Sequence, residues 1–206
     1  MLENKLGINN EIELAKEEER ITKLKALELF DTNKINEFEV GTTKGLCEIH
    51  KFLFSDIYLF AGKIREVNLS KGNFRFASSI YLKDVLSKID SMKEDTFEDI
   101  IKKYVEMNVA HPFREGNGIS TRIWLDMILK TRISKVVDWS KINKEEYLLA
   151  MERSPIKDTE IKLLLKEALT DKINDRTVYM KGIDVSYKYE GYNVYTMNEL
   201  DKTRES

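Results

Sequence analysis

The sequence is poor in the residues that usually cross-link or interrupt a fold. Its 206 residues include one cysteine, two prolines, two histidines and nine glycines. The single cysteine, Cys47, excludes an intrachain disulfide and fits a reducing compartment. Because proline and glycine are the main breakers of regular structure, their scarcity predicts an all-α chain.

Long apolar runs are also missing. No stretch approaches the ~20 apolar residues that span a bilayer, and the N-terminal segment MLENKLGINNEIELAKEEER lacks the apolar run of a signal peptide. The net charge of −2 gives no overall attraction to nucleic acid or to anionic membranes. Length and composition therefore predict a single cytoplasmic domain over residues 1–206, with neither nucleic acid nor membrane as a partner.

Capping residues and periodicity place the expected elements. Thr96 followed by Asp99 predicts a helix start, and Pro112 predicts that this helix ends at His111. Residues 64–78 combine β-branched and aromatic residues around a glycine, which favours a short β-hairpin. Residues 200–206 are expected to fray. Further helices are expected at 10–30, 42–55, 119–131, 143–153, 158–169 and 177–190.

The octapeptide HPFREGNG, residues 111–118, gathers several scarce residues in one place. It joins the end of one expected helix to the start of the next. Gly116, Asn117 and Gly118 therefore lie where backbone N–H groups have no partner inside the helix. A helix start with small residues is suited to binding phosphate, and Arg122, about one turn further on, can add a charge-assisted bond to the same anion.

Two more side chains of this segment suit phosphoryl chemistry. Glu115 alone would repel a phosphate, and a bridging Mg²⁺ reconciles the two. A neutral His111 can accept a proton from an attacking hydroxyl. The structural alternative is a glycine-rich turn between packed helices with a histidine that serves only the fold. Local sequence reasoning leaves both interpretations open.

The octapeptide resembles the signature of the Fic family, His-x-Phe-x-(Asp/Glu)-Gly-Asn-(Gly/Lys)-Arg-x-x-Arg. The matching residues are His111, Phe113, Glu115, Gly116, Asn117, Gly118 and Arg122. The segment FAGKIREVNLSKGNFRFA resembles the family's helix end and hairpin flap, and Asn108 also fits. This resemblance covers nearly the whole chain. It implies a compact Fic-type helical bundle with a β-hairpin flap, which transfers AMP from ATP to a hydroxyl of a target protein.

The resemblance also implies a role for each matching residue. His111 would be the general base, Glu115 would hold Mg²⁺, and Arg122 would bind the γ-phosphate end of ATP. The flap residues Lys71, Gly72 and Asn73 would clamp the target segment by strand-like pairing. Glycine at position 118 favours AMP transfer, because kinase-like relatives carry lysine there. The residues expected to bind ATP and its phosphates are Asn108, Gly116, Asn117, Gly118, Ile119, Ser120, Thr121 and Arg122.

One position departs from the family pattern. The arginine expected directly after Gly118 is replaced by Ile119. A charge-assisted hydrogen bond is worth roughly 1.5–3 kcal/mol, so its loss would lower nucleotide binding or rate by about one or two orders of magnitude. One alternative is a weakened Fic fold that acts as an interaction module. The other is an Ile119 that packs into the core while Mg²⁺, Arg122 and the helix start hold the pyrophosphate.

A second motif stands near the C-terminus, Ser186-Tyr187-Lys188-Tyr189-Glu190-Gly191. Alone it is typical of a helix end capped by glycine. Beside the octapeptide it resembles the family's C-terminal inhibitory motif, (Ser/Thr)-x-x-x-Glu-(Gly/Asn), on a helix at about 181–192. Ser186 and Glu190 are four residues apart and share a helix face. Glu190 is expected to pair with Arg122 and to place a carboxylate where the γ-phosphate would sit.

The resemblance leaves further alternatives open. Glu190 can instead position a water that removes AMP from a modified target, which would make the enzyme bifunctional. Tyr187 and Tyr192 are candidate self-modification sites. A type II topoisomerase subunit is a candidate target by family analogy, and relatives that self-assemble suggest a homo-oligomer. His50 is assigned no role.

Overall fold

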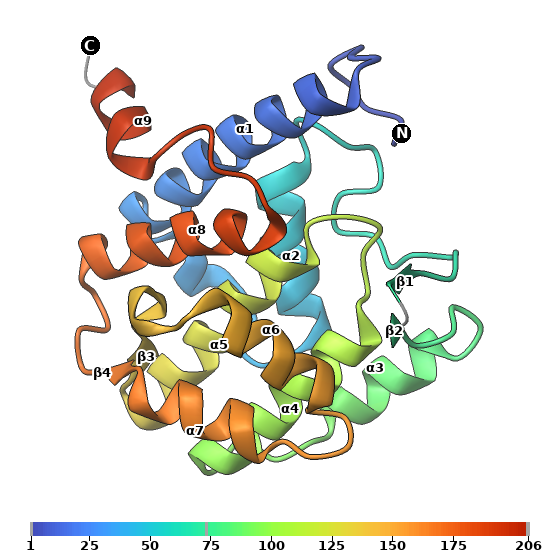
Figure 1. Ribbon diagram of the computed structural model, residues 1–206, viewed down its shortest axis with the longest axis vertical. Coiled ribbons are helices and arrows are strands. Elements are labelled where there is room, and N and C mark those ends of the chain that lie inside the picture. Colours follow the sequence, from blue (N-terminus) through green and yellow to red (C-terminus); the bar gives the residue numbers. More distant parts are fainter. Residues whose placement is uncertain (1, 73, 205–206) are drawn as a thin grey trace.

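The computed structural model describes residues 2–72 and 74–204, and helices dominate this part of the chain, as the sequence predicts (Figure 1). The elements in chain order are α1 (Glu11–Asp31), η1 (Lys34–Glu37), α2 (Thr43–Phe54), β1 (Ser70–Lys71), β2 (Phe74–Arg75), α3 (Leu82–Asp90), α4 (Phe97–Ala110), α5 (Asn117–Ile133), β3 (Val136–Val137), η2 (Trp139–Lys141), α6 (Lys144–Arg153), α7 (Thr159–Glu167), β4 (Leu169–Thr170), α8 (Arg176–Glu190) and α9 (Met197–Arg204). No described helix is both long and apolar enough to cross a membrane.

Helix α5 lies at the centre of the bundle and packs against α2, α4 and α8 (Figure 1). Its predicted stripe of Ile119, Ile123 and Met127 is buried, and Trp124 on another face is fully buried. Residues 119–125 are all buried, the polar ones included, so neighbouring elements cover this part of α5 on every side. The start of α5 is therefore fixed by packing.

Helix α4 leads into the octapeptide as predicted. Thr96 and Asp99 form a reciprocal capping box at its start. The helix ends at His111, which has left-handed backbone angles of φ 48° and ψ 63°. Pro112 disfavours helical geometry in the residue before it, so the chain turns here and reaches α5 within a few residues.

The predicted hairpin is shorter than expected. Strands β1 and β2 pair antiparallel over two residues each, Ser70 with Arg75 and Lys71 with Phe74. The other described residues of the range 64–78 lie outside any strand. The side chain of the buried Arg65 holds this segment, because it donates hydrogen bonds to carbonyl oxygens of Val67, Ala77, Ala110 and His111. One buried guanidinium thus attaches the flap to the end of α4. The predicted flap residue Asn73 lies outside the described residues.

The C-terminal segment also differs from expectation. Residues 197–204 form α9 rather than a frayed end. Arg176 pairs with both Asp31 and Asp201, and Arg204 pairs with Asp31, so α9 is tied to α1 and α8. These ion pairs join residues far apart in sequence, which local patterns do not reveal. Helix α3 and the strand pair β3–β4 were likewise not predicted.

Candidate active site

A cavity of about 270 Å³ lies between the start of α5, the flap and the end of α8. The residues that line it come from five separate parts of the sequence. Of the predicted site residues, those at the cavity are Lys71, His111, Glu115, Gly116, Asn117, Gly118, Ile119, Ser186, Tyr187, Glu190 and Tyr192. The octapeptide and the C-terminal motif therefore share one site.

His111 is held at the cavity by its backbone and by its ring. Its amide donates to the carbonyl of Met107, and its carbonyl accepts from Arg65 Nε at 2.7 Å. The imidazole stacks on Phe76 of the flap with ring centroids 3.7 Å apart. Burial lowers the pKa of His111 to about 4, although the charge of Glu190 acts in the opposite direction. The imidazole is therefore neutral at ordinary pH and can accept a proton.

The loop of the octapeptide is closed by its own asparagine. Asn117 Nδ2 donates to the carbonyl of Phe113 at 2.8 Å, and Asn117 Oδ1 accepts from the Phe113 amide at 2.9 Å. Gly116 has a φ of 75°, and a β-carbon there would lie 2.3 Å from the Phe54 ring. Only glycine fits this turn. The side chain of Asn117, predicted to bind phosphate, thus shapes the loop.

His50 supports the same loop, a role that sequence reasoning missed. Its Nδ1 accepts from the Gly62 amide at 2.8 Å, its Nε2 donates to the Glu115 carbonyl at 2.9 Å, and its ring stacks on Phe113. Burial lowers the pKa of His50 to about 4, which keeps the ring neutral. A signal was present, because position 50 follows Leu46 by four residues and precedes Leu53 by three, on the buried face of α2.

The start of α5 presents backbone donors to the cavity. The Ser120 amide bonds to the Gly116 carbonyl at 3.3 Å, so the amides of Asn117, Gly118 and Ile119 precede this bond at the helix start. These three residues line the cavity. N–H groups in this position carry partial positive charge and suit an anion.

Glu115 is the acidic group nearest this helix start in sequence. It is exposed at the cavity mouth, and its Oε1 accepts from the Gly116 amide at 3.1 Å. Desolvation by the surrounding protein raises the pKa of Glu115, and the charge of Glu190 adds to this. Within the described residues, no three His, Cys, Asp or Glu side chains gather as a metal site. One carboxylate beside a phosphate site nevertheless fits Mg²⁺, which is usually bound by one or two carboxylates together with substrate phosphates.

A third carboxyl group, Glu18 of α1, also lines the cavity and was not predicted. Burial first, and then the charges of Glu115 and Glu190, raise its pKa to about 8, although the Tyr58 hydroxyl donates to it. The carboxyl of Glu18 therefore holds a proton at neutral pH.

Arg122 lies beneath α8 rather than in the cavity. Its Nε donates to Ser186 Oγ at 2.8 Å and its Nη2 donates to the Ser186 carbonyl at 3.1 Å. The guanidinium also lies over the rings of Trp139, Tyr147 and Tyr189. Ser186 thus occupies donor atoms of the arginine that was expected to bind ATP.

The expected direct pairing of Glu190 with Arg122 is wrong in this structure. Glu190 pairs instead with Lys71 of the flap, with Glu190 Oε2 and Lys71 Nζ 2.9 Å apart. Within residues 2–72 and 74–204, Glu190 forms no other ion pair. Glu190 and Arg122 still approach each other across Gly118, because a β-carbon there would lie 2.7 Å from Glu190 Oε1 and 2.9 Å from Arg122 Nη2. Burial acts to raise the pKa of Glu190, but the charges of Arg122 and Lys71 lower it. Glu190 is therefore ionised between two cations.

Besides Arg122, three residues expected to bind phosphate do not line the cavity. Asn108 Nδ2 donates to the Tyr104 carbonyl of its own helix, and Thr121 Oγ1 donates to the Asn117 carbonyl. The buried Ser120 hydroxyl has no hydrogen-bond partner among the described residues. Ser120 and Thr121 are buried because neighbouring helices cover this part of α5, whereas Asn108 is partly buried on α4.

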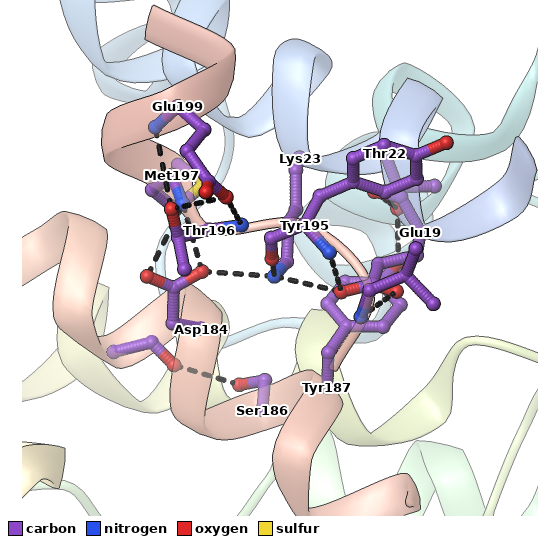
Figure 2. A network of polar contacts seen from close by, with 12 residues as sticks. Glu19, Thr22, Lys23, Asp184, Ser186, Tyr187, Tyr195, Thr196, Met197 and Glu199 are labelled. Atoms are coloured by element: carbon purple, nitrogen blue, oxygen red, sulfur yellow. Dashed lines mark hydrogen bonds and ion pairs between the residues drawn. The ribbon is translucent and has the colours of Figure 1, made fainter. Parts of the chain in front are cut away.

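A buried polar network anchors α8 to α1 (Figure 2). Lys23 is fully buried, and its Nζ lies 2.9 Å from Glu19 Oε1 and 2.8 Å from Asp184 Oδ1, while it also donates to the Tyr195 carbonyl. Glu19 accepts from the amides of Val194 and Tyr195, and Asp184 accepts from the amide of Met197. We call Glu19, Lys23, Asp184 and residues 194–197 the clasp.

The tyrosines of the C-terminal motif differ in access. Tyr187 is buried, and its hydroxyl shares a hydrogen bond with Thr22 of α1. Tyr192 is 42% exposed at the cavity. Gly191 caps α8 in the left-handed conformation, as predicted. Of the two candidate self-modification sites, Tyr192 is therefore the accessible one.

Comparison with known proteins places this site in a family. Residues 41–129 match the profile of the Fic/DOC family. The chain is 27% identical to protein adenylyltransferase VbhT of Bartonella schoenbuchensis, over 93% of this chain and 44% of that protein. It is also 27% identical to the probable protein adenylyltransferase Fic of Salmonella typhimurium, over 83% of this chain and 88% of that protein.

A solved structure shares the fold. The BepC protein of Bartonella tribocorum, crystallised with bound AMPPNP, has a TM-score of 0.67 and 20% identity, covering 82% of this chain and 92% of that one. The matched profile contains His111, the loop and Arg122, which the geometry also groups around α5. Residues 41–129 of this chain therefore match the Fic/DOC family.

Proposed function

We propose that this protein is an adenylyltransferase that moves AMP from ATP to a hydroxyl side chain of a target protein, and that α8 holds it in an inhibited state. The observation that supports this most is the meeting of a neutral His111, a helix start and Glu190 in one cavity. The chain spans 44% of VbhT but 88% of the Salmonella relative, so activity is carried over here as a proposal.

His111 performs the proton transfer in this account. Its neutral ring accepts the proton of the target hydroxyl while the hydroxyl oxygen forms a bond to the α-phosphorus of ATP. The bond from that phosphorus to the bridging oxygen breaks, and pyrophosphate leaves. The amides at the start of α5 stabilise the charge on the phosphate oxygens. Mg²⁺ held by Glu115 would neutralise charge on the phosphates when it is bound.

Glu190 opposes this reaction by charge and by position. Its carboxylate lies at the cavity between Lys71 and the Arg122 side of Gly118. A triphosphate that enters the same region meets a like charge, which disfavours its binding. Ser186 meanwhile holds Arg122. Withdrawal of the end of α8 therefore frees Arg122 for ATP.

The target and the cellular setting extend the same proposal. The exposed flap around Lys71 offers the backbone of β1 and β2 for strand-like pairing with a target segment. A type II topoisomerase subunit, a cytoplasmic location, a single Fic domain with an inhibitory helix, and assembly of copies of the chain are proposals that rest on family analogy.

The position of the label identifies the transferred group. The Glu190→Gly variant should attach label to protein from α-³²P-ATP with Mg²⁺ but not from γ-³²P-ATP, because AMP keeps only the α-phosphate. The substrate is a cell lysate, and gel autoradiography followed by peptide mass measurement locates the label.

The double variant Glu190→Gly/His111→Ala is the control and should transfer no label, because the base is gone. Label from γ-³²P-ATP without label from α-³²P-ATP would instead indicate phosphate or pyrophosphate transfer. Label that appears only with Ile119→Arg added would identify this chain as a disabled relative that acts through binding.

A further inference from the structure

Among the described residues, two cations that the proposed mechanism does not use line the cavity, Lys71 and Arg114. Lys71 extends from β1, and its side chain is 66% exposed, while that of its partner Glu190 is 38% exposed. Exposed ion pairs contribute between about 0 and 1 kcal/mol. The pair is therefore weak, and Lys71 can exchange Glu190 for another anion at little cost.

Lys71 lies close enough to the site for its charge to affect several ionisable groups there. Its charge acts to lower the pKa values of His111, Glu115 and Glu190. One ammonium thus lies close enough to influence the base, the metal-binding acid and the inhibitory acid together. An ion that binds among these three groups lies within the same field.

The start of α5 lacks the arginine that the family pattern has there. Ile119 lines the cavity where the family pattern has arginine, and its side chain is 5% exposed. Arg122 is beneath α8, and the Arg114 guanidinium lies over the Phe60 ring, 5.6 Å from its centroid. The start of α5 therefore offers backbone donors to the cavity. Of the two lysine and arginine side chains that line the cavity among the described residues, Lys71 pairs with Glu190, whereas Arg114 lies over Phe60.

We propose that Lys71 is a phosphate-binding residue that replaces the missing arginine: when Glu190 withdraws, the ammonium of Lys71 binds the triphosphate of ATP. This inference rests on the proposed function, since it assumes that ATP enters this cavity. The same lysine then has two partners, the inhibitory carboxylate in the closed state and the terminal phosphates in the open state. Because Lys71 belongs to the flap, ATP would also draw the flap over the nucleotide.

The test is direct binding rather than turnover. In the Glu190→Gly background, Lys71→Met should bind AMPPNP with Mg²⁺ about tenfold to a hundredfold more weakly by calorimetry, the range expected for one charge-assisted bond. Binding of AMP should change little, because AMP lacks the terminal phosphates. Lys71→Arg should keep the affinity, and Ile119→Arg should restore it to Lys71→Met.

The matched control is Lys63→Met, an exposed lysine on the same segment that does not line the cavity. Equal AMPPNP affinity of the Lys71→Met and Lys63→Met variants would overturn the proposal, as would an equal loss for AMP and AMPPNP. Thermal unfolding confirms that each variant folds. If Glu190→Gly binds AMPPNP but transfers no AMP, the proposed function fails. The AMPPNP affinities of the Lys71 and Lys63 variants still decide the role of Lys71.

Discussion

At the scale of single residues, the two histidines show how one property serves two purposes. Both rings are neutral because the surrounding protein lowers their pKa values to about 4. His50 uses one nitrogen as donor and the other as acceptor to hold the loop. His111 is only half-buried and keeps access to the cavity. Neutrality therefore supports structure at one position and proton acceptance at the other.

This assignment predicts a pH dependence that NMR can follow. With only two histidines in the chain, each C–H resonance is identified by comparison with His111→Ala. Both should titrate at about 4 in the folded state. In the unfolded chain the same histidines bind protons at about pH 6.5. Between pH 6.5 and 4 only the unfolded state takes up these protons, so the free energy of unfolding should be highest above pH 6.5 and should fall as the pH is lowered to 4. Titration of either resonance near 6.5 would contradict the assignment.

The sequence identified the residues of the octapeptide better than those that support it. His111, Glu115 and Gly118 do line the cavity. Arg65 was missed, because its four carbonyl partners are chosen by the fold and leave no local pattern. The Lys71–Glu190 pair was missed for the same reason, since 119 positions separate its members.

At the scale of elements, α8 is held by two unequal attachments. The Lys23–Glu19 ion pair of the clasp is fully buried, with both side chains 0% exposed. The pair between Glu190 and Lys71 is open to solvent. Figure 1 shows α8 beside α1, with the flap at the other side of the cavity. The end of α8 can therefore leave the flap more easily than the helix can leave α1.

Removal of the clasp lysine, Lys23, should make α8 leave α1 more easily. Lys23→Met leaves Glu19 and Asp184 without their cation, and loss of one partner from a buried pair typically destabilises by about 3–5 kcal/mol. Amides of α8 and of residues 194–197 should exchange faster with deuterium, while those of α5 change less. Lys25→Met, on the same helix with exposed partners, is the control. Equal protection of α8 in both variants would show that the clasp does not anchor it.

At the scale of the whole molecule, the sequence predicted the main helices of the bundle, but it did not predict α9 or how short the strands of the flap are. Expected helices at 10–30, 42–55 and 143–153 match α1, α2 and α6 within about one residue, because periodicity and caps are local. Helix α9 depends on ion pairs to α1 and α8. The flap depends on Arg65 instead of a long strand ladder. Elements stabilised by distant partners escape local patterns.

The bundle brings its two ends to one cavity, and the central claim is that the C-terminal end inhibits the site. Glu190→Gln keeps the shape of the side chain but removes its charge, and Glu190→Gly removes both. Lys188→Gly is a matched control, because it weakens the same exposed turn of α8 and leaves Glu190 in place.

The decisive measurement is the initial rate of AMP incorporation from α-³²P-ATP by these four proteins. We expect the rate to rise from wild type to Glu190→Gln to Glu190→Gly, by about tenfold to a hundredfold in total if one charged contact is replaced by the nucleotide, while Lys188→Gly stays near wild type. A Glu190→Gly rate no higher than that of wild type, or an equal rise in Lys188→Gly, would contradict inhibition by Glu190.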